Sequence, residues 1–253
     1  MKPITLLASV CAFVAAISGV WSAPQTRIVG GDDAVPGQLP YQAALAVGGS
    51  FNCGAVILSE LYVLTSLHCV CSAGSDKPWP PQLFTVRAGT TDIYSGGVSI
   101  VVEEITVNPN YHDLSTGIAL LKLRSPFTFN EYIQPIPLAQ SNPPLEAEVE
   151  ISGWGRTKEG QTDMYRYLQL NEATVIDPAE CARDLGREDP DILCMSHPRK
   201  NGICRGDFGG PAVYNGQVVG IASAVIGECG SYLPDVFTSV AAHYQWIQNT
   251  MQA

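Results

Sequence analysis

Basic residues are scarce in this sequence. Of its 253 residues, 14 are Lys or Arg and 24 are Asp or Glu, which gives a formal net charge of −10. Nucleic-acid binding draws on clustered Lys and Arg that replace the counterions of the phosphates. The densest basic stretch contains only Arg199, Lys200 and Arg205 and is typical of a solvated loop. The composition therefore argues against a nucleic-acid partner.

Metal-binding and glycosylation patterns are also absent. No Cys-x-x-Cys pair is followed by a His pair at zinc-finger spacing, and His112, His197 and His243 show no ligand spacing with His68. We therefore expect no metal and no cofactor. No Asn-x-Ser/Thr sequon occurs, so N-glycosylation is not expected.

Only one long hydrophobic run is present, and it lies at the N-terminus. Lys2 precedes an apolar run from Ile4 to Val20, with small residues such as Ser22 and Ala23 near its end. This layout is typical of a secretory signal peptide. The alternative is a membrane anchor, but about 17 apolar residues are at the short limit for a span. We expect a signal peptide over residues 1–22, a short propeptide over residues 23–27, a secreted protein and no membrane association.

Cysteine usage agrees with secretion. Removal of the signal peptide removes Cys11 and leaves seven cysteines, which are Cys53, Cys69, Cys71, Cys181, Cys194, Cys204 and Cys229. Disulfides are expected in an oxidising compartment. Because seven is odd, one thiol must be free or bonded to another chain.

Short apolar segments separated by Gly and Pro predict an all-β fold. Many of these segments are rich in Val, Ile and Thr, and most are too short for helices. The predicted strands are Gln42–Val47, Cys53–Ser59, Tyr62–Leu67, Leu83–Ala88, Val98–Val107, Ile118–Leu123, Val149–Trp154, Leu168–Val175, Val213–Ser223 and Val236–Val240.

Helix signals are few. They are confined to Pro178–Leu185 and to Ala241–Met251, where Tyr244, Ile247 and Met251 share one helical face. A Pro-rich stretch, Pro135–Pro144, divides the strand-rich chain into two comparable halves. This division suggests two packed barrels joined by an extended linker, with the last helix docked on them.

Five ordered motifs resemble the trypsin and chymotrypsin family of serine proteases. They are Arg27-Ile28-Val29-Gly30-Gly31, Leu64-Thr65-Ser66-Leu67-His68-Cys69, Ile118-Ala119-Leu120-Leu121-Lys122-Leu123, Ser152-Gly153-Trp154-Gly155 and Gly206-Asp207-Phe208-Gly209-Gly210-Pro211. The resemblance runs from Arg27 to the C-terminal helix and implies a peptidase domain over residues 28–253. The implied fold is two packed six-stranded antiparallel β-barrels with a C-terminal helix.

The catalytic triad of that family is degenerate in this chain. Its mechanism uses a Ser hydroxyl as the nucleophile, a His as the base and an Asp that orients the imidazole. His68 matches its motif. Gly117 stands where the resemblance places the Asp, and Phe208 stands where it places the Ser. Asp113, four residues before Gly117, could reach toward His68, but a displaced carboxylate would not restore a nucleophile. Ser223 matches a serine that in the family supports the Asp and lines the substrate cleft, so we expect no rescue from it either.

Other family features are retained. Gly206 lies at the oxyanion position, and Asp207 lies where the family pairs an Asp with the new amino terminus made by cleavage. Here that cleavage would follow Arg27, and the new terminus would be Ile28. The resemblance therefore leaves open either an activation switch without chemistry or a relic of one.

The substrate pocket departs from the family in two places. Where the family usually has Ser-Trp-Gly, this chain has Ser223-Ala224-Val225. Gly202 occupies the place of the acid in trypsin-like enzymes, whereas Asp235 falls on the opposite wall, as in the collagenase-like brachyurin branch. A vestigial pocket that accepts a basic or small side chain is one interpretation, although Phe208 would crowd its entrance.

The family pattern pairs Cys53 with Cys69, Cys181 with Cys194, and Cys204 with Cys229. Cys71 is then unpaired, and it could remain free, displace Cys69 or form a disulfide-linked dimer.

The resemblance to arthropod members implies a secreted, inactive protease homologue that binds extracellular proteins, such as proteases or their substrates. An active extracellular endopeptidase with unusual catalytic residues and an inert scaffold are the alternatives.

Overall fold

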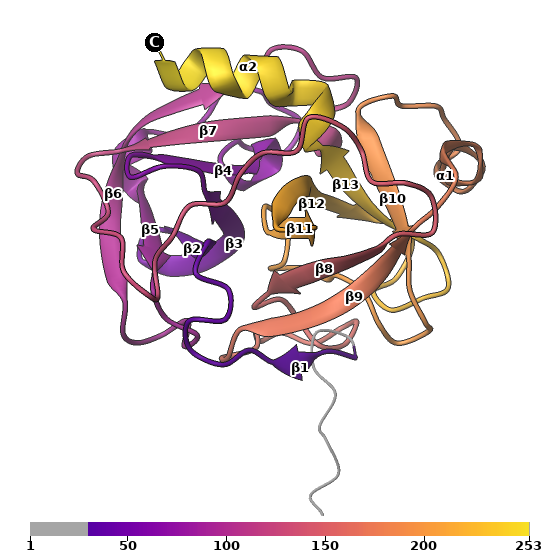
Figure 1. The fold of residues 1–253 in the computed structure, drawn as a ribbon, viewed down its shortest axis with the longest axis horizontal. Coiled ribbons are helices and arrows are strands. Elements are labelled where there is room, and N and C mark those ends of the chain that lie inside the picture. The colour runs from indigo at the N-terminus through magenta and orange to yellow at the C-terminus, as the bar shows by residue number, and fades with distance from the viewer. Residues whose placement is uncertain (1–29, 253) are drawn as a thin grey trace, which may run out of the picture.

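The computed structural model describes residues 30–252 and builds them around two β-barrels (Figure 1). In the first barrel the strands close in the order β2-β3-β4-β7-β6-β5. Along β5, Phe84, Val86 and Ala88 are buried while Thr85 and Arg87 are half-buried, which is the alternation of a strand with one face on a core. The strands are β2 (Gln42–Val47), β3 (Ser50–Ile57), β4 (Tyr62–Ser66), β5 (Phe84–Ala88), β6 (Val98–Val107) and β7 (Ile118–Leu123).

The second barrel contains the remaining long strands. They follow the order β9-β10-β13-β12-β11-β8, and an additional pairing of β8 with β9 closes the ring. The short strand β1 (Asp32–Asp33) pairs antiparallel with the first two residues of β9, Gln169 and Leu170. The barrel strands are β8 (Glu148–Gly153), β9 (Gln169–Val175), β10 (Ile192–Ser196), β11 (Pro211–Tyr214), β12 (Gln217–Val225) and β13 (Asp235–Ser239). The predicted all-β fold with two six-stranded antiparallel barrels is confirmed.

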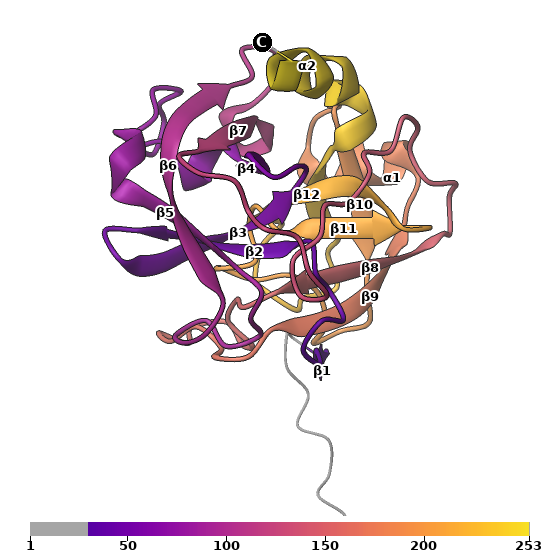
Figure 2. The ribbon, with the colours of Figure 1, turned by 60° about the vertical axis from the view of Figure 1, so that its left-hand side comes forward.

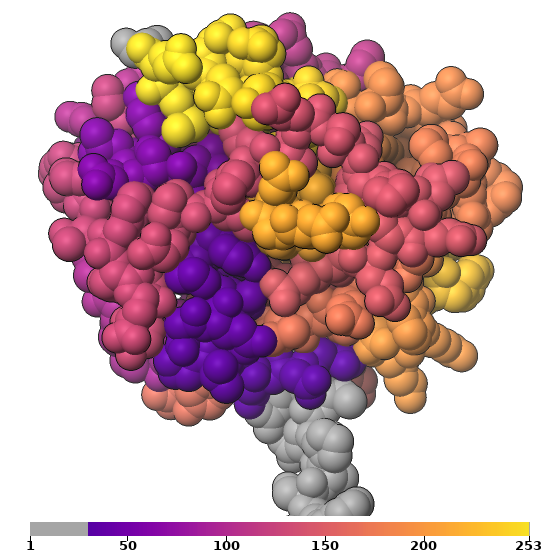
Figure 3. All heavy atoms as spheres, in the orientation of Figure 1, coloured from indigo at the N-terminus to yellow at the C-terminus, as the bar shows by residue number. Residues whose placement is uncertain are grey.

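An extended segment connects the barrels over residues 124–147, which includes the predicted linker Pro135–Pro144. It crosses one face of the molecule, where Leu138 forms a parallel bridge with Val218 (Figures 1 and 3). Seen after a 60° turn, the two barrels lie side by side, with the C-terminal helix over one end (Figure 2). The residues that line the cleft at His68 come from both barrels.

Two strand predictions are wrong. The segment Val213–Ser223 is a hairpin of β11 and β12 rather than one strand, because Asn215 and Gly216 adopt φ values of 49° and 71°. These positive angles are those of a type I′ turn, for which Asn-Gly is a preferred pair. The sequence prediction also missed β10, a short apolar run directly after Asp191.

The two predicted helices are present. In α1 (Pro178–Leu185), the Asp177 side chain accepts a hydrogen bond from the Ala179 N–H at 2.7 Å, and Gly186 ends the helix with a φ of 78°. The C-terminal α2 (Val240–Gln252) buries Ile247 and packs Tyr244 and Met251 on the same core. The 3₁₀ turns are η1 (Leu67–Cys69), η2 (Pro81–Leu83) and η3 (Leu114–Thr116). None of the helices within residues 30–252 has the length and apolarity needed to span a membrane.

Three disulfides join Cys53 to Cys69, Cys181 to Cys194, and Cys204 to Cys229. These are the pairs that the family resemblance implies. Cys71 is free and only 4% exposed, and burial and Asp76 together raise the pKa of its thiol to about 11. A disulfide to a second chain would therefore require local opening around Cys71.

Candidate functional site

Strand pairing brings His68, Gly117 and Phe208 together. His68 lies in η1 directly after β4, and the pairing of β4 with β7 sets the Leu67 N–H 2.8 Å from the Gly117 carbonyl. The Phe208 carbonyl accepts from the Gly54 N–H at 2.8 Å. The rings of His68 and Phe208 meet edge to face, with centroids 5.0 Å apart and an interplanar angle of 83°. The three triad positions thus converge as the resemblance implies.

A hydroxyl rather than a carboxylate faces the imidazole of His68. The Ser66 Oγ lies 2.8 Å from His68 Nδ1 and 3.5 Å from the Gly117 carbonyl oxygen. On the other side of the ring, Nε2 is buried and has no hydrogen-bond partner among the described residues. Burial lowers the pKa of His68 to about 4. The histidine is therefore neutral at physiological pH and lacks a counterion for its charged form.

Leu67 fills the space next to Gly117. A Cβ placed on Gly117 would lie 2.6 Å from Leu67 Cδ2 and 3.0 Å from Leu67 Cβ. Because Leu67 is only 1% exposed in the core of the first barrel, it cannot turn out to solvent without leaving a cavity. An aspartate at position 117 would thus require the buried Leu67 side chain to shift. Sequence reasoning missed the roles of Ser66 and Leu67, although both stand beside His68 in its motif.

Phe208 packs on the cores of both barrels. Its phenyl ring offers no hydroxyl or thiol to attack a carbonyl group. Next to it is a cleft of about 400 Å³, and His68 is one of the residues that line it. The cleft is lined by His68, Ser115, Glu159, Arg205, Phe208, Ser223, Ala224, Val225, Gly227, Glu228 and Cys229.

The two residues considered for rescue have other partners. The Asp113 carboxylate accepts from the Ser115 N–H at 2.8 Å and forms an ion pair with Arg187 at 3.1 Å. The Ser223 Oγ lies 2.5 Å from Thr238 Oγ1, which in turn donates to the Thr116 carbonyl at 2.7 Å. Among the described residues neither side chain forms a hydrogen bond or ion pair with His68, so both serve the scaffold.

Asp207 is fully buried beside Gly206, which has a φ of 103°. Its carboxylate accepts from the Gly155 N–H at 2.7 Å and from the Cys204 N–H at 2.9 Å. Burial raises its pKa to about 7, against the two N–H donors, and no cation is paired with it among residues 30–252. The predicted cleavage residues Arg27 and Ile28 lie outside the described residues, as do the predicted signal peptide and propeptide.

The remaining pocket residues do not open into this cleft. Gly202 and Asp235 come together, but neither lines the cleft, because the ring of His197 lies against both. His197 Nε2 is 3.3 Å from Asp235 Oδ2, and each of these two side chains is 1% exposed. Sequence reasoning assigned no role to His197.

Two groups of side chains have metal-like spacing. Within the described residues they are Cys53, His68 and Cys69, and Glu159, Cys204 and Cys229. Every cysteine in them belongs to a disulfide and so has no thiolate to offer as a ligand. Neither group fits a metal centre.

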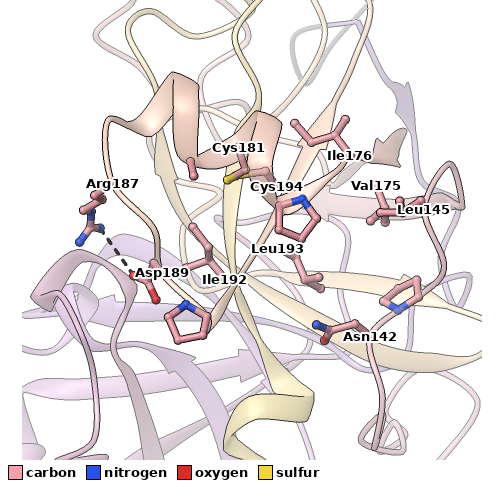
Figure 4. Close-up of a pocket in the computed structure, with 14 residues that line it drawn as sticks. Asn142, Leu145, Val175, Ile176, Cys181, Arg187, Asp189, Ile192, Leu193 and Cys194 are labelled. Carbon is pink, nitrogen blue, oxygen red and sulfur yellow. Dashed lines mark ion pairs between the residues drawn. A yellow bond between two sulfur atoms is a disulfide. The ribbon is translucent and has the colours of Figure 1, made fainter.

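A separate cavity of about 170 Å³ lies beside the Cys181–Cys194 disulfide (Figure 4). Its walls are mainly apolar, with Leu145, Ile176 and Leu193 among them. Arg187 and Asp189 stand at one side, 3.7 Å apart. It shares no lining residue with the cleft at His68 and contains no catalytic constellation.

Comparison with known proteins shows which family this chain resembles in sequence and structure. The family model described as Trypsin matches residues 28–247. Serine protease SP24D of Anopheles gambiae is 38% identical over 228 residues, which cover 89% of this chain and 82% of the relative. Trypsin delta of Drosophila erecta is 31% identical over 255 residues, covering 98% of each. The solved structure of neuropsin, described as a serine protease expressed in the limbic system of mouse brain, has a TM-score of 0.79 at 28% identity and covers 87% of this chain and 98% of that one.

Proposed function

Because the chain belongs to the trypsin family of serine proteases, we propose that it is a secreted, catalytically inactive member that acts by binding extracellular proteins. The observation that carries this proposal is the joint replacement of the triad. Phe208 supplies no nucleophile, Gly117 supplies no carboxylate, and Leu67 crowds the position that a Cβ at residue 117 would take.

Known magnitudes support the loss of turnover. In the serine-protease template, loss of the Asp function alone costs about 10⁴ in turnover, and loss of any triad member leaves only about 10³ to 10⁴ over the uncatalysed reaction. Phe208 also places a ring against His68, where the carbonyl of a substrate would approach. Both catalytic groups are replaced here, and the substrate platform carries Ala224 and Val225 as well.

Binding is the function that the retained features can still perform. The cleft keeps apolar walls at Phe208, Ala224 and Val225 and acidic side chains at Glu159 and Glu228. Asp207 remains poised, buried and without a cation among the described residues, so cleavage after Arg27 would supply the Ile28 ammonium as its partner. We include this switch in the proposal, with proteases or their substrates as the partners.

Labelling with a fluorophosphonate tests the inactivity. We expect no covalent labelling of the wild type after cleavage at Arg27, since no activated serine is present. The positive control is the variant that carries F208S, G117D and L67A together. It regains a nucleophile, a carboxylate and more space beside residue 117.

The same variant without G117D should react about 10⁴-fold more slowly. The variant F208A with G117D and L67A is the matched control, because it opens the same space without a hydroxyl. Labelling of the wild type at rates near those of an active relative would contradict the proposal and favour an endopeptidase with unusual catalytic residues.

Binding through the cleft is tested separately. The cleaved protein would be offered defined active proteases and their protein substrates in a biolayer assay, with V225R to block the cleft and V98R, on an exposed part of the first barrel, as the matched control. Affinity that V225R weakens and V98R leaves unchanged supports the proposal. Absence of binding to every protein in the set favours an inert scaffold.

A further inference from the structure

His197 and Asp235 form an enclosed pair below the cleft. His197 directly follows β10, and Asp235 is the first residue of β13, which pairs with β10 through Met195 and Asp235. Their side chains are 3.3 Å apart and almost completely buried. His197 Nδ1 also lies 3.1 Å from the Pro198 carbonyl oxygen. His197 Nε2 makes no hydrogen bond among the described residues, so the charged ring is favoured by its closeness to the Asp235 carboxylate and by the contact of Nδ1 with the Pro198 carbonyl.

The pair has no space for a third side chain. A Cβ on Gly202 would overlap both Asp235 Oδ2 and His197 Nε2, and Gly202 has a φ of 102°, which favours glycine. The carboxylate and the ring therefore fill the position toward which a side chain at residue 202 would point. An external cation would have to displace His197 to reach Asp235.

Two consecutive amides connect this pair to Asp207. The Ile203 N–H donates to Asp235 Oδ2 at 2.6 Å, and the next amide, of Cys204, donates to Asp207 Oδ2 at 2.9 Å. The loop from Gly202 to Asp207 is therefore held between two buried carboxylates. Because this loop carries Gly206 and leads into Phe208, its shape sets the wall of the cleft.

We propose that His197 and Asp235 form a proton-dependent clamp on the loop from Gly202 to Asp207. With His197 protonated, the pair is internally neutralised and Asp235 holds the Ile203 amide. When His197 loses its proton, Asp235 becomes a buried carboxylate without a cation near a second one, Asp207, and the loop loosens. This inference does not depend on whether the chain hydrolyses peptides.

The surrounding charges define the direction of the response. Asp235 faces His197 from β13 and raises the pKa of Asp207 in the loop. Burial raises the pKa of Asp235 itself, against the effects of His197 and the Ile203 N–H. Arg199 and Lys200 follow His197 on its own segment and are exposed. Burial opposes the charge on His197, but Asp235 and the Pro198 carbonyl outweigh it and raise its pKa above the usual value. The stabilisation is thus complete below about pH 6.5 and is lost as pH rises through the folded-state pKa.

Hydrogen exchange of the full chain tests the clamp. Protection factors of the Ile203 and Cys204 amides, corrected for intrinsic exchange, should fall above the pKa of His197 by at most about tenfold per pH unit. In the H197Q variant, which keeps a side-chain donor but no titratable ring, the loss of protection at the Ile203 amide should disappear. The pH dependence that remains at the Cys204 amide reports Asp207, to which that amide is bonded and whose pKa is about 7. Amides of β2, such as Ala44, provide the internal control.

Titration of the wild type gives a second readout that requires no variant. The ¹³C-labelled Cε1 signal of His197 should titrate above pH 6.5. Titration of His197 at or below 6.5, or the same pH profile in H197Q as in the wild type, would overturn the clamp.

Discussion

At the scale of single residues, the site around His68 has lost two catalytic side chains and is also packed differently. Leu67 and Gly117 are complementary in volume, and the Ser66 hydroxyl contacts the ring nitrogen at 2.8 Å. A lone loss of the nucleophile would leave the space for a carboxylate intact. Here a buried leucine crowds the Cβ position of residue 117, so we expect restored activity to need a change at position 67 as well as at the two triad positions.

The protonation of His68 gives a prediction at this scale. Because burial under Phe208 lowers the pKa of its ring to about 4, its NMR signals should not titrate between pH 5 and 8. In F208A the ring gains solvent, and its pKa should move toward 6.5.

The S66A variant is the control for the hydroxyl contact. It should leave the pKa of His68 low, since burial is the cause of the shift. Titration of wild-type His68 near 6.5 would show that the ring is solvated rather than enclosed.

At the scale of elements, the alternation of apolar and polar residues, together with turn residues, predicts most strands. It does not predict which segments are two strands joined by a tight turn. β2, β6 and β7 occupy the predicted ranges, because each is bounded by clear polar or glycine signals. The apolar character of both arms of the β11–β12 hairpin predicts a single strand, although Asn215-Gly216 between them is a strong hairpin signal. The convergence of His68, Gly117 and Phe208 came from the family resemblance. The positions of Leu67 and His197 depend on long-range packing, which no local pattern encodes.

The hairpin turn can be tested by substitution. Gly216 has a φ of 71° and open space where a Cβ would lie, so G216A should destabilise the fold through the backbone alone, by roughly 1–2 kcal/mol. The N215G variant, which keeps the turn, should be close to neutral. Urea unfolding of the three proteins measures this difference. Equal midpoints and slopes would mean that the turn does not constrain the second barrel.

At the scale of the whole molecule, the buried carboxylate of Asp207 should make folding depend on pH. Its raised pKa, about 7, means that the folded state holds this proton more tightly than the unfolded chain does. Its contribution to the free energy of unfolding should therefore fall by about 3 kcal/mol as pH rises from 4 to 7.

Cleavage after Arg27 should reverse this behaviour. If the Ile28 ammonium reaches Asp207, the pKa of the carboxyl falls and its cost at neutral pH disappears. Urea unfolding from pH 4 to 7.5, on the intact protein, the cleaved protein and the D207N variant, measures the effect. Identical pH profiles for intact and cleaved protein would mean that the cleavage site is a relic rather than a switch.

The most direct test of the central claim is peptide hydrolysis by the cleaved wild-type protein, measured beside its H68A variant on a broad peptide library. The account predicts that both remain at the rate of the buffer blank, because neither contains a nucleophile at position 208. Hydrolysis by the wild type well above the blank and abolished by H68A would contradict it, since the retained histidine would then be serving a catalytic site.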